Sequence, residues 1–144
     1  MVSTIYNNAK NLIGEGSITW DSLAQTYQIL LVNASYVPNI DTDLYVSSVT
    51  NELTGGNYVR KTLTGRTATT DTGNDRCDFK ADNVTWSAIS AGTAAAAVLF
   101  KFVSSDSDSP LIAYISFTST VTNGGDLTLK WDGQLTNGRL FSIA

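Results

Sequence analysis

Two long apolar runs in the second half of the chain constrain its fold more than any other feature. Residues 94–103 and 111–117 are apolar on nearly both faces of an extended chain. Strands of this kind lie in the middle of a sheet and are covered on both sides. The seven polar or turn-forming residues between them, 104–110, end in Pro110 and predict a turn. The sequence therefore predicts two central strands joined by a polar turn.

The rest of the chain carries shorter patterns that are typical of strands. Leu127, Leu129 and Trp131 alternate with polar residues after a glycine-containing turn, which predicts a half-buried strand. Short strands with regular turn signals favour a mainly β, single-domain β-sandwich or small barrel of about seven to nine strands, with one or two short helices. A second helix is possible within residues 41–53, and the other expected strands lie at residues 25–32, 57–63, 67–70, 76–81, 84–86 and 140–143.

The first residues are expected to form a short helix or an arm. Ile5, Leu12 and Ile13 share one face at helical spacing, and Gly14 would end the helix. So short a helix is marginal alone and needs a surface to pack on. We therefore divide the chain into an N-terminal arm or short helix, 1–14, and a single β-rich domain, 15–144. The arm is expected to pack on a neighbouring molecule, and the alternative is that it covers the end of its own sheet.

Composition argues against several classes of function. The net charge is −4 and no basic run is present, so no nucleic-acid partner is expected. Histidine is absent, which removes the usual Ser-His-Asp and Cys-His sites and most transition-metal sites. The longest apolar run is far too short to span a membrane, and the N-terminus lacks the features of a signal peptide. We expect a soluble protein made in the cytoplasm, with no enzymatic activity and no cofactor.

The remaining reactive groups have ordinary structural interpretations. Cys77 alternates with Phe79 and Ala81 and is expected to be a buried small hydrophobe. Asp106 and Asp108 resemble the start of a calcium loop but lack its glycine and its distal glutamate, so no metal site is expected. The other carboxylates are expected to be solvated surface acids rather than a catalytic pair.

The aromatic residues divide into two groups. Trp86 and Trp131 fall on the apolar faces of predicted strands and are expected in the core. Trp20 and Tyr36 lie next to predicted turns, which makes them candidates for exposed contacts, including stacking on a sugar. The candidate interface residues are accordingly Ile5, Tyr6, Leu12, Ile13, Trp20 and Tyr36.

An ordered set of segments resembles a family of short virion proteins of tailed bacteriophages. The resemblance covers most of the chain except residues 66–75, and it is carried by the set of segments in order rather than by any one motif. Its segments are AKNLIGEG at residues 9–16 with Trp20 and Asp21, YQILLV at 27–32, YVPN at 36–39, GNY at 56–58, ADNVTW at 81–86, PLIAYI at 110–115 and GGDLTLKW at 124–131.

The resemblance implies a β-sandwich-like domain that coats or cements a particle, with no active site. The role expected from it is a capsid cement or decoration protein on the virion surface, synthesised in the host cytoplasm. Its partners would be the major capsid protein and neighbouring copies of itself, as a homotrimer. The alternative role is a head-fibre or tail-tip module that recognises host surface glycans.

Overall fold

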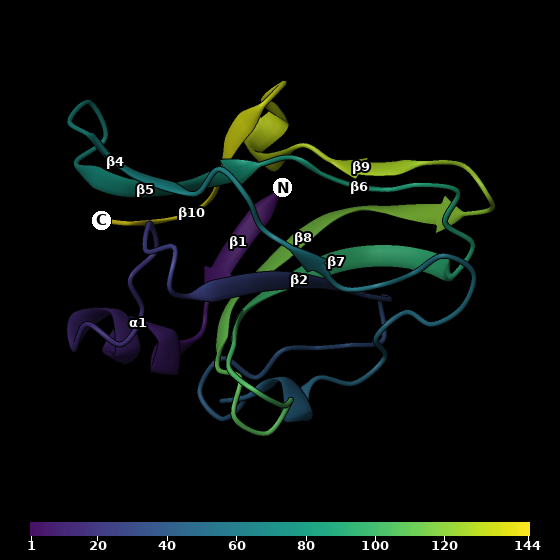
Figure 1. Cartoon of the computed structure of the whole chain (residues 1–144), viewed down its shortest axis with the longest axis horizontal. Coiled ribbons are helices and arrows are strands. Elements are labelled where there is room, and N and C mark those ends of the chain that lie inside the picture. The colour runs from purple at the N-terminus through teal and green to yellow at the C-terminus, as the bar shows by residue number, and fades with distance from the viewer.

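A computed structural model describes all residues, 1–144, as a mainly β domain with ten strands and one α-helix. Figure 1 shows a central sheet with further strands above it and a helix and irregular chain below it. Short 3₁₀ turns lie at Val46–Ser48 and Trp131–Gly133. In chain order the elements are β1 (Val2–Ile5), α1 (Asn7–Gly14), β2 (Thr26–Val32), β3 (Lys61–Thr62), β4 (Thr67–Asp71), β5 (Arg76–Asp82), β6 (Val84–Trp86), β7 (Gly92–Phe102), β8 (Leu111–Thr122), β9 (Leu127–Leu129) and β10 (Asn137–Ile143).

The central sheet has five strands in the order β1-β8-β7-β2-β3. Strands β7 and β8 form the predicted antiparallel pair, with Leu99 opposite Ala113 and Val98 opposite Tyr114. All residues from Ala94 to Phe100 are buried, so both faces of β7 are covered. The prediction of two central strands is confirmed, and so is the mainly β sandwich class.

One face of the central sheet is covered by two smaller sheets. These have the orders β10-β5-β4 and β6-β9. An aromatic cluster joins the layers: Trp20 lies 5.0 Å from Tyr27 of β2 and 5.5 Å from Phe141 of β10 between ring centroids. Phe141 in turn stacks on Phe79 of β5 at 4.4 Å. Burial of these large rings between the sheets stabilises the sandwich.

The other face is covered by α1 and by the irregular segment 33–56 (Figure 1). Tyr36, Val46 and Leu53 of this segment are buried in the core. Backbone hydrogen bonds tie the segment to the sheet, since the Leu53 N–H donates to Leu31 O and the Leu111 N–H to Leu44 O. The expected helix within residues 41–53 is therefore reduced to the 3₁₀ turn, because the backbone groups bond to neighbouring strands and loops.

The N-terminal segment folds back onto its own domain. Strand β1 pairs with β8, from Val2 opposite Ser116 to Ile5 opposite Ala113. The helix predicted at residues 5–13 is found at Asn7–Gly14, and Tyr6 and Ala9 are completely buried. In this structure the segment follows the alternative and covers its own sheet, where Tyr6 and Ala9 are buried and Ile5, Leu12 and Ile13 are partly buried.

Two predicted strands are shorter in the structure than in the prediction. The strand expected at residues 57–63 contains only β3, because Asn57 has a positive φ of 58° and the Tyr58 N–H donates to Gly55 O in a turn. Trp131 is buried as predicted, although it follows β9 in a 3₁₀ turn. Its indole N–H donates to Asp82 O at 2.8 Å, which gives the buried nitrogen a partner.

We predict that Trp131→Ala lowers the free energy of unfolding by roughly 3–5 kcal/mol, because it removes a completely buried ring and leaves a cavity. Urea denaturation followed by circular dichroism measures the change. Trp131→Phe keeps most of the buried ring and is expected to lose less. A loss below about 1 kcal/mol for Trp131→Ala would show that the ring does not fill the core.

Gly138 offers a second test, because β10 passes directly over the turn that contains Trp131. A Cβ atom at Gly138 would lie 1.8 Å from Trp131 O, whereas a Cβ atom at Gly125 would meet nothing within 4 Å. Gly138→Ala is therefore expected to lower the melting temperature strongly and Gly125→Ala to leave it nearly unchanged. Equal melting temperatures for the two variants would contradict the placement of β10.

Candidate functional site

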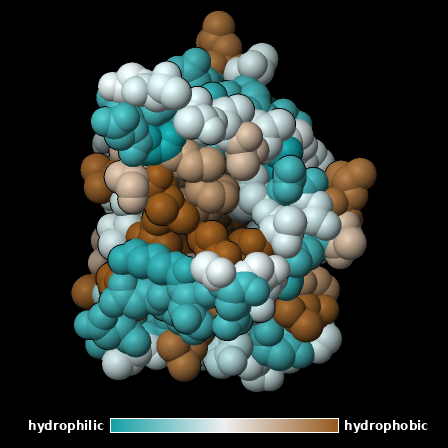
Figure 2. Space-filling view, turned by 90° about the vertical axis from the view of Figure 1, so that its left-hand side faces the viewer, coloured by the Kyte–Doolittle hydropathy of each residue, from teal (hydrophilic) through white to brown (hydrophobic).

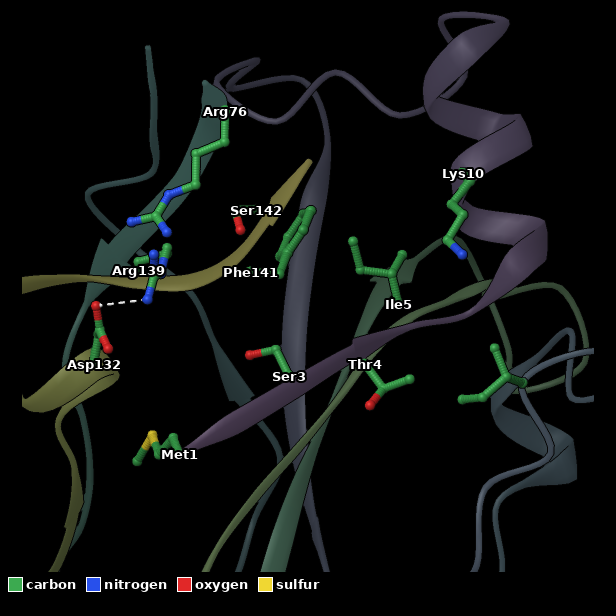
Figure 3. Close-up of a pocket in the computed structure, with 11 residues that line it drawn as sticks. Met1, Ser3, Thr4, Ile5, Lys10, Arg76, Asp132, Arg139, Phe141 and Ser142 are labelled. Carbon is green, nitrogen blue, oxygen red and sulfur yellow. Dashed lines mark ion pairs between the residues drawn. The ribbon is translucent and has the colours of Figure 1, made fainter. Parts of the chain in front are cut away.

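A groove opens between the edge strands β1 and β10, at the side of the sandwich where α1 lies. We call it the edge groove; it has a volume of about 450 Å³. Figure 2 shows this side of the molecule, with hydrophobic residues gathered in a hollow between two hydrophilic margins. Its lining includes Ser3, Ile5, Lys10, Arg76, Arg139 and Phe141. Figure 3 shows Ser3 and Ile5 on the side of β1 that faces Phe141 and Ser142 of β10.

Charged side chains lie at both ends of the edge groove. Arg139 forms an ion pair with Asp132 at 3.0 Å, and Arg76 forms ion pairs with Asp78 at 2.8 Å and with Asp71 at 3.1 Å. Both guanidinium groups approach Asp78 Oδ1, Arg76 at 2.8 Å and Arg139 at 3.7 Å, so they lie together (Figure 3). At the other end, Lys10 extends from α1 toward Ile5 (Figure 3), and its ammonium group donates a hydrogen bond to Asn7 Oδ1 at 2.9 Å.

A second hollow lies on the opposite side of α1. We call it the tyrosine hollow; it has a volume of about 240 Å³ and is lined by Leu12, Tyr45, Val103 and Pro110, among others. Leu12 projects about 200° around the helix from Lys10, since each residue turns the helix by roughly 100°. One short helix thus separates two open hollows. Val103 is 52% exposed and Tyr45 is 39% exposed, so apolar surface is open to solvent here.

The structure separates the predicted interface residues into two groups. Ile5 lines the edge groove and Leu12 lines the tyrosine hollow, while Ile13 is partly buried against the core. The others, Tyr6, Trp20 and Tyr36, are buried. The prediction that Trp20 and Tyr36 are exposed is wrong, because they are only 3% and 4% accessible.

The physical reason for this burial is that each of these aromatic residues finds a polar partner inside the molecule. The indole N–H of Trp20 donates to Lys80 O at 2.9 Å. The hydroxyl groups of Tyr6 and Tyr36 are 2.9 Å apart, and Tyr36 also donates to Asp43 at 3.0 Å. Burial raises the pKa of Tyr36 to about 12, so the hydroxyl remains protonated and able to donate at neutral pH.

The turn at residues 104–110 uses both of its carboxylates in hydrogen bonds. Arg60 forms a bidentate contact with Asp106, at 2.6 and 2.9 Å, and also bonds Glu52. Asp108 accepts from the backbone N–H groups of Ser104, at 3.0 Å, and Ser105, at 2.7 Å. These are the contacts of a tightly bonded turn.

Cys77 is less buried than predicted. It lies in β5, where it is partly exposed and packs against the edge of the core. The alternation of β5 is confirmed at Phe79 and Ala81, which are buried, while Cys77 lies near the open end of the same strand. The end of a strand is less well covered than its middle, which accounts for the difference.

The residues that form the edge groove could not be recognised as a group from the sequence. Ser3 and Phe141 are separated by almost the whole chain, and their proximity follows from where β1 and β10 lie in different sheets. The alternation of Leu140 to Ile143 did predict a strand there. No local pattern indicates which other strand it lies beside.

Comparison of the chain with models of protein families, with curated proteins and with solved structures finds no significant match. None of its helices has the length and apolarity that crossing a membrane requires.

We predict that the turn at residues 104–110 stabilises the fold and that this stabilisation is lost in acid. Hydrogen bonds, first from the Ser104 side chain and then from backbone N–H groups, lower the pKa of Asp108 to about 2. A carboxylate with a lowered pKa in the folded state stabilises the fold above its unfolded pKa of about 4. That stabilisation is lost as the pH falls from about 4 through 2.

The measurement is an NMR titration of the Asp108 carboxyl group. Ser104→Ala should move its pKa up toward the ordinary value. Ser107→Ala is the control, because the Ser107 hydroxyl contacts Ser105 Oγ rather than Asp108. A wild-type pKa near 4 would refute the hydrogen-bonding arrangement.

Proposed function

We propose that the chain is a structural protein of a tailed bacteriophage particle, a cement or decoration protein that binds the major capsid protein on the outside of the shell. The segments that resemble short virion proteins support this role. The observation that carries it is the apolar surface open to solvent at the tyrosine hollow, where Leu12, Tyr45 and Val103 lie. Apolar surface that remains open on a folded domain marks sites of protein interaction.

The proposed assembly is a homotrimer that binds at local threefold positions of the shell. Closed cyclic symmetry lets each copy use the same surface, both for its neighbours and for the capsid subunit beneath it. Sedimentation velocity checks this part of the proposal, since the trimer has three times the chain mass of 15.4 kDa.

The alternative role is a fibre or tail-tip module that binds host glycans, and its main support was a set of exposed aromatic side chains. A sugar-stacking platform was expected at Trp20 and Tyr36, and both rings are buried in the core. Trp86 and Trp131 are completely buried as well. The number of copies in a virion separates the two roles, because a shell binds many copies, while a fibre or tail tip carries few.

We predict that Val103→Asp abolishes binding to capsids. The substitution places a carboxylate beside the apolar side chains of Leu12, Tyr45 and Pro110 in the tyrosine hollow, where contact with a partner would remove it from water. Val121→Asp is the matched control, because Val121 is 67% exposed on β8 and does not line the hollow. Both variants replace exposed side chains, so both should keep the wild-type melting temperature.

The measurement is co-sedimentation of the purified protein with capsids that lack it. Wild type and Val121→Asp should pellet with the capsids, and Val103→Asp should remain in the supernatant. Failure of the wild-type protein to pellet would overturn the proposed function. Binding by all three proteins would remove the tyrosine hollow from the interface.

A further inference from the structure

Strand β1 has one free edge, and that edge faces the edge groove. Its only strand partner is β8. Tyr6 N–H donates to Ile112 O at 3.0 Å, and hydrogen-bonded pairs alternate along an antiparallel ladder. The backbone groups of Val2 and Thr4 therefore point to β8, and those of Ser3 and Ile5 point away from it. An extended chain in the groove could pair with these two residues.

The opposite wall of the groove is also an edge strand. β10 pairs with β5 alone, and its register shifts between Arg139 and Phe141. The Ser3 hydroxyl donates to Leu140 O, which holds the two edges together at one end of the groove. Apolar contact is available beside the free edge, since Ile5 and Phe141 line the groove together. The groove thus combines backbone hydrogen-bonding groups with an apolar wall, as sites of strand addition do.

The charges that line the groove indicate the chemistry of the occupant, since three of its side chains are cationic, Lys10, Arg76 and Arg139, and one is a carboxylate, Asp132. Lys10 has no carboxylate partner, and its hydrogen bond is to the amide of Asn7. At the other end, Arg139 Nη1 is buried and has no hydrogen-bond partner, although Asp78 Oδ1 lies 3.7 Å away. A carboxylate could pair with the Lys10 ammonium group at one end and with the exposed part of the Arg139 side chain, which is 24% accessible, at the other.

The other edges of the fold offer less. β3 contains two residues, β6 and β9 contain three residues each, and β4 is a threonine-rich strand that does not line the groove. Short or polar edges are a usual protection against strand pairing. β1 is the edge at which an extended strand finds hydrogen bonds, an apolar contact and charge together.

We propose that the edge groove binds an extended, acidic segment of a neighbouring polypeptide, which adds to β1 as a further strand. The segment would pair with Ser3 and Ile5 and place carboxylates near Lys10 and Arg139. Over the length of β1 this corresponds to roughly 14 Å of extended chain. The proposal rests on the proposed function in one respect: the neighbour on a particle is the capsid subunit.

The experiment titrates the isolated protein with a synthetic peptide, acetyl-Asp-Thr-Val-Thr-Val-Asp-amide, and follows the amide NMR signals. The control peptide carries Lys in place of both Asp residues. Binding of the acidic peptide should shift the Ser3 and Ile5 signals, and the lysine peptide should bind at least tenfold more weakly. No shift at millimolar acidic peptide would overturn the proposal, as would equal binding of the two peptides.

Two substitutions at one position test the strand pairing. Ser3→Pro removes a backbone N–H that points into the groove, and proline is tolerated on an edge strand where the N–H is unpaired. Ser3→Ala removes the hydroxyl and keeps that N–H. Ser3→Pro should bind the acidic peptide at least tenfold more weakly than Ser3→Ala. Equal binding by the two folded variants would refute strand addition.

A charge reversal keeps the test decisive if Ser3→Pro fails to fold. Lys10 is exposed, so Lys10→Glu should fold normally. This variant should lose most of the preference for the acidic peptide, because one of the two cationic ends becomes anionic while Arg139 is unchanged. An unchanged preference would overturn the acidic assignment.

Co-sedimentation with capsids separates this proposal from the proposed function. If wild type binds capsids and Ser3→Pro binds equally well, the groove has no part in attachment, and the proposed function stands. If wild type fails to bind capsids yet binds the acidic peptide as described, the proposed function fails, and the groove keeps its specificity for an extended acidic chain.

Discussion

The apolar β7–β8 pair must be covered on both of its faces, and the rest of the fold is arranged to do so. Every residue of β7 from Ala94 to Phe100 is buried, although successive side chains point to opposite faces of the sheet. The two smaller sheets cover one face, and α1 with segment 33–56 covers the other. Leaving either face in water would expose a row of large apolar side chains, at roughly 25 cal/mol for each Å² of apolar surface.

Covering two faces does not close the edges of the central sheet, and this explains where the groove lies. The upper layer ends in β10 and the central sheet ends in β1, on the same side of the molecule (Figure 1). The aromatic cluster of Trp20, Tyr27 and Phe141 holds the layers together behind these edges. The groove therefore lies on a well-packed support, while its rim keeps the outward backbone groups of β1 and the ammonium group of Lys10, which has no carboxylate partner.

The sequence predicted the elements that depend on local pattern and failed where distant segments meet. The strands around Leu99, Ile115 and Leu129 were evident because apolar runs and strict alternation are local signals. The burial of Trp20 and Tyr36 was missed because their partners, Lys80 O and the Tyr6 hydroxyl, lie far away in the chain. Of the candidate interface residues, Ile5 and Leu12 line the two hollows, whereas Arg76 and Arg139 were not foreseen, since neither belongs to a basic run.

The covered β7–β8 pair forms the stable centre of the domain, and β1 leaves a strand edge open beside the groove. Amide hydrogen exchange of the free protein, measured residue by residue, distinguishes the two. Amides in the middle of β7 should exchange most slowly, at the rate set by global unfolding. Within and next to β1, Thr4 and Tyr6 should be protected and Ser3 and Ile5 should exchange much faster, because only the first two bond to β8. Equal protection at all four positions would contradict the account, since the edge at β1 would then be closed.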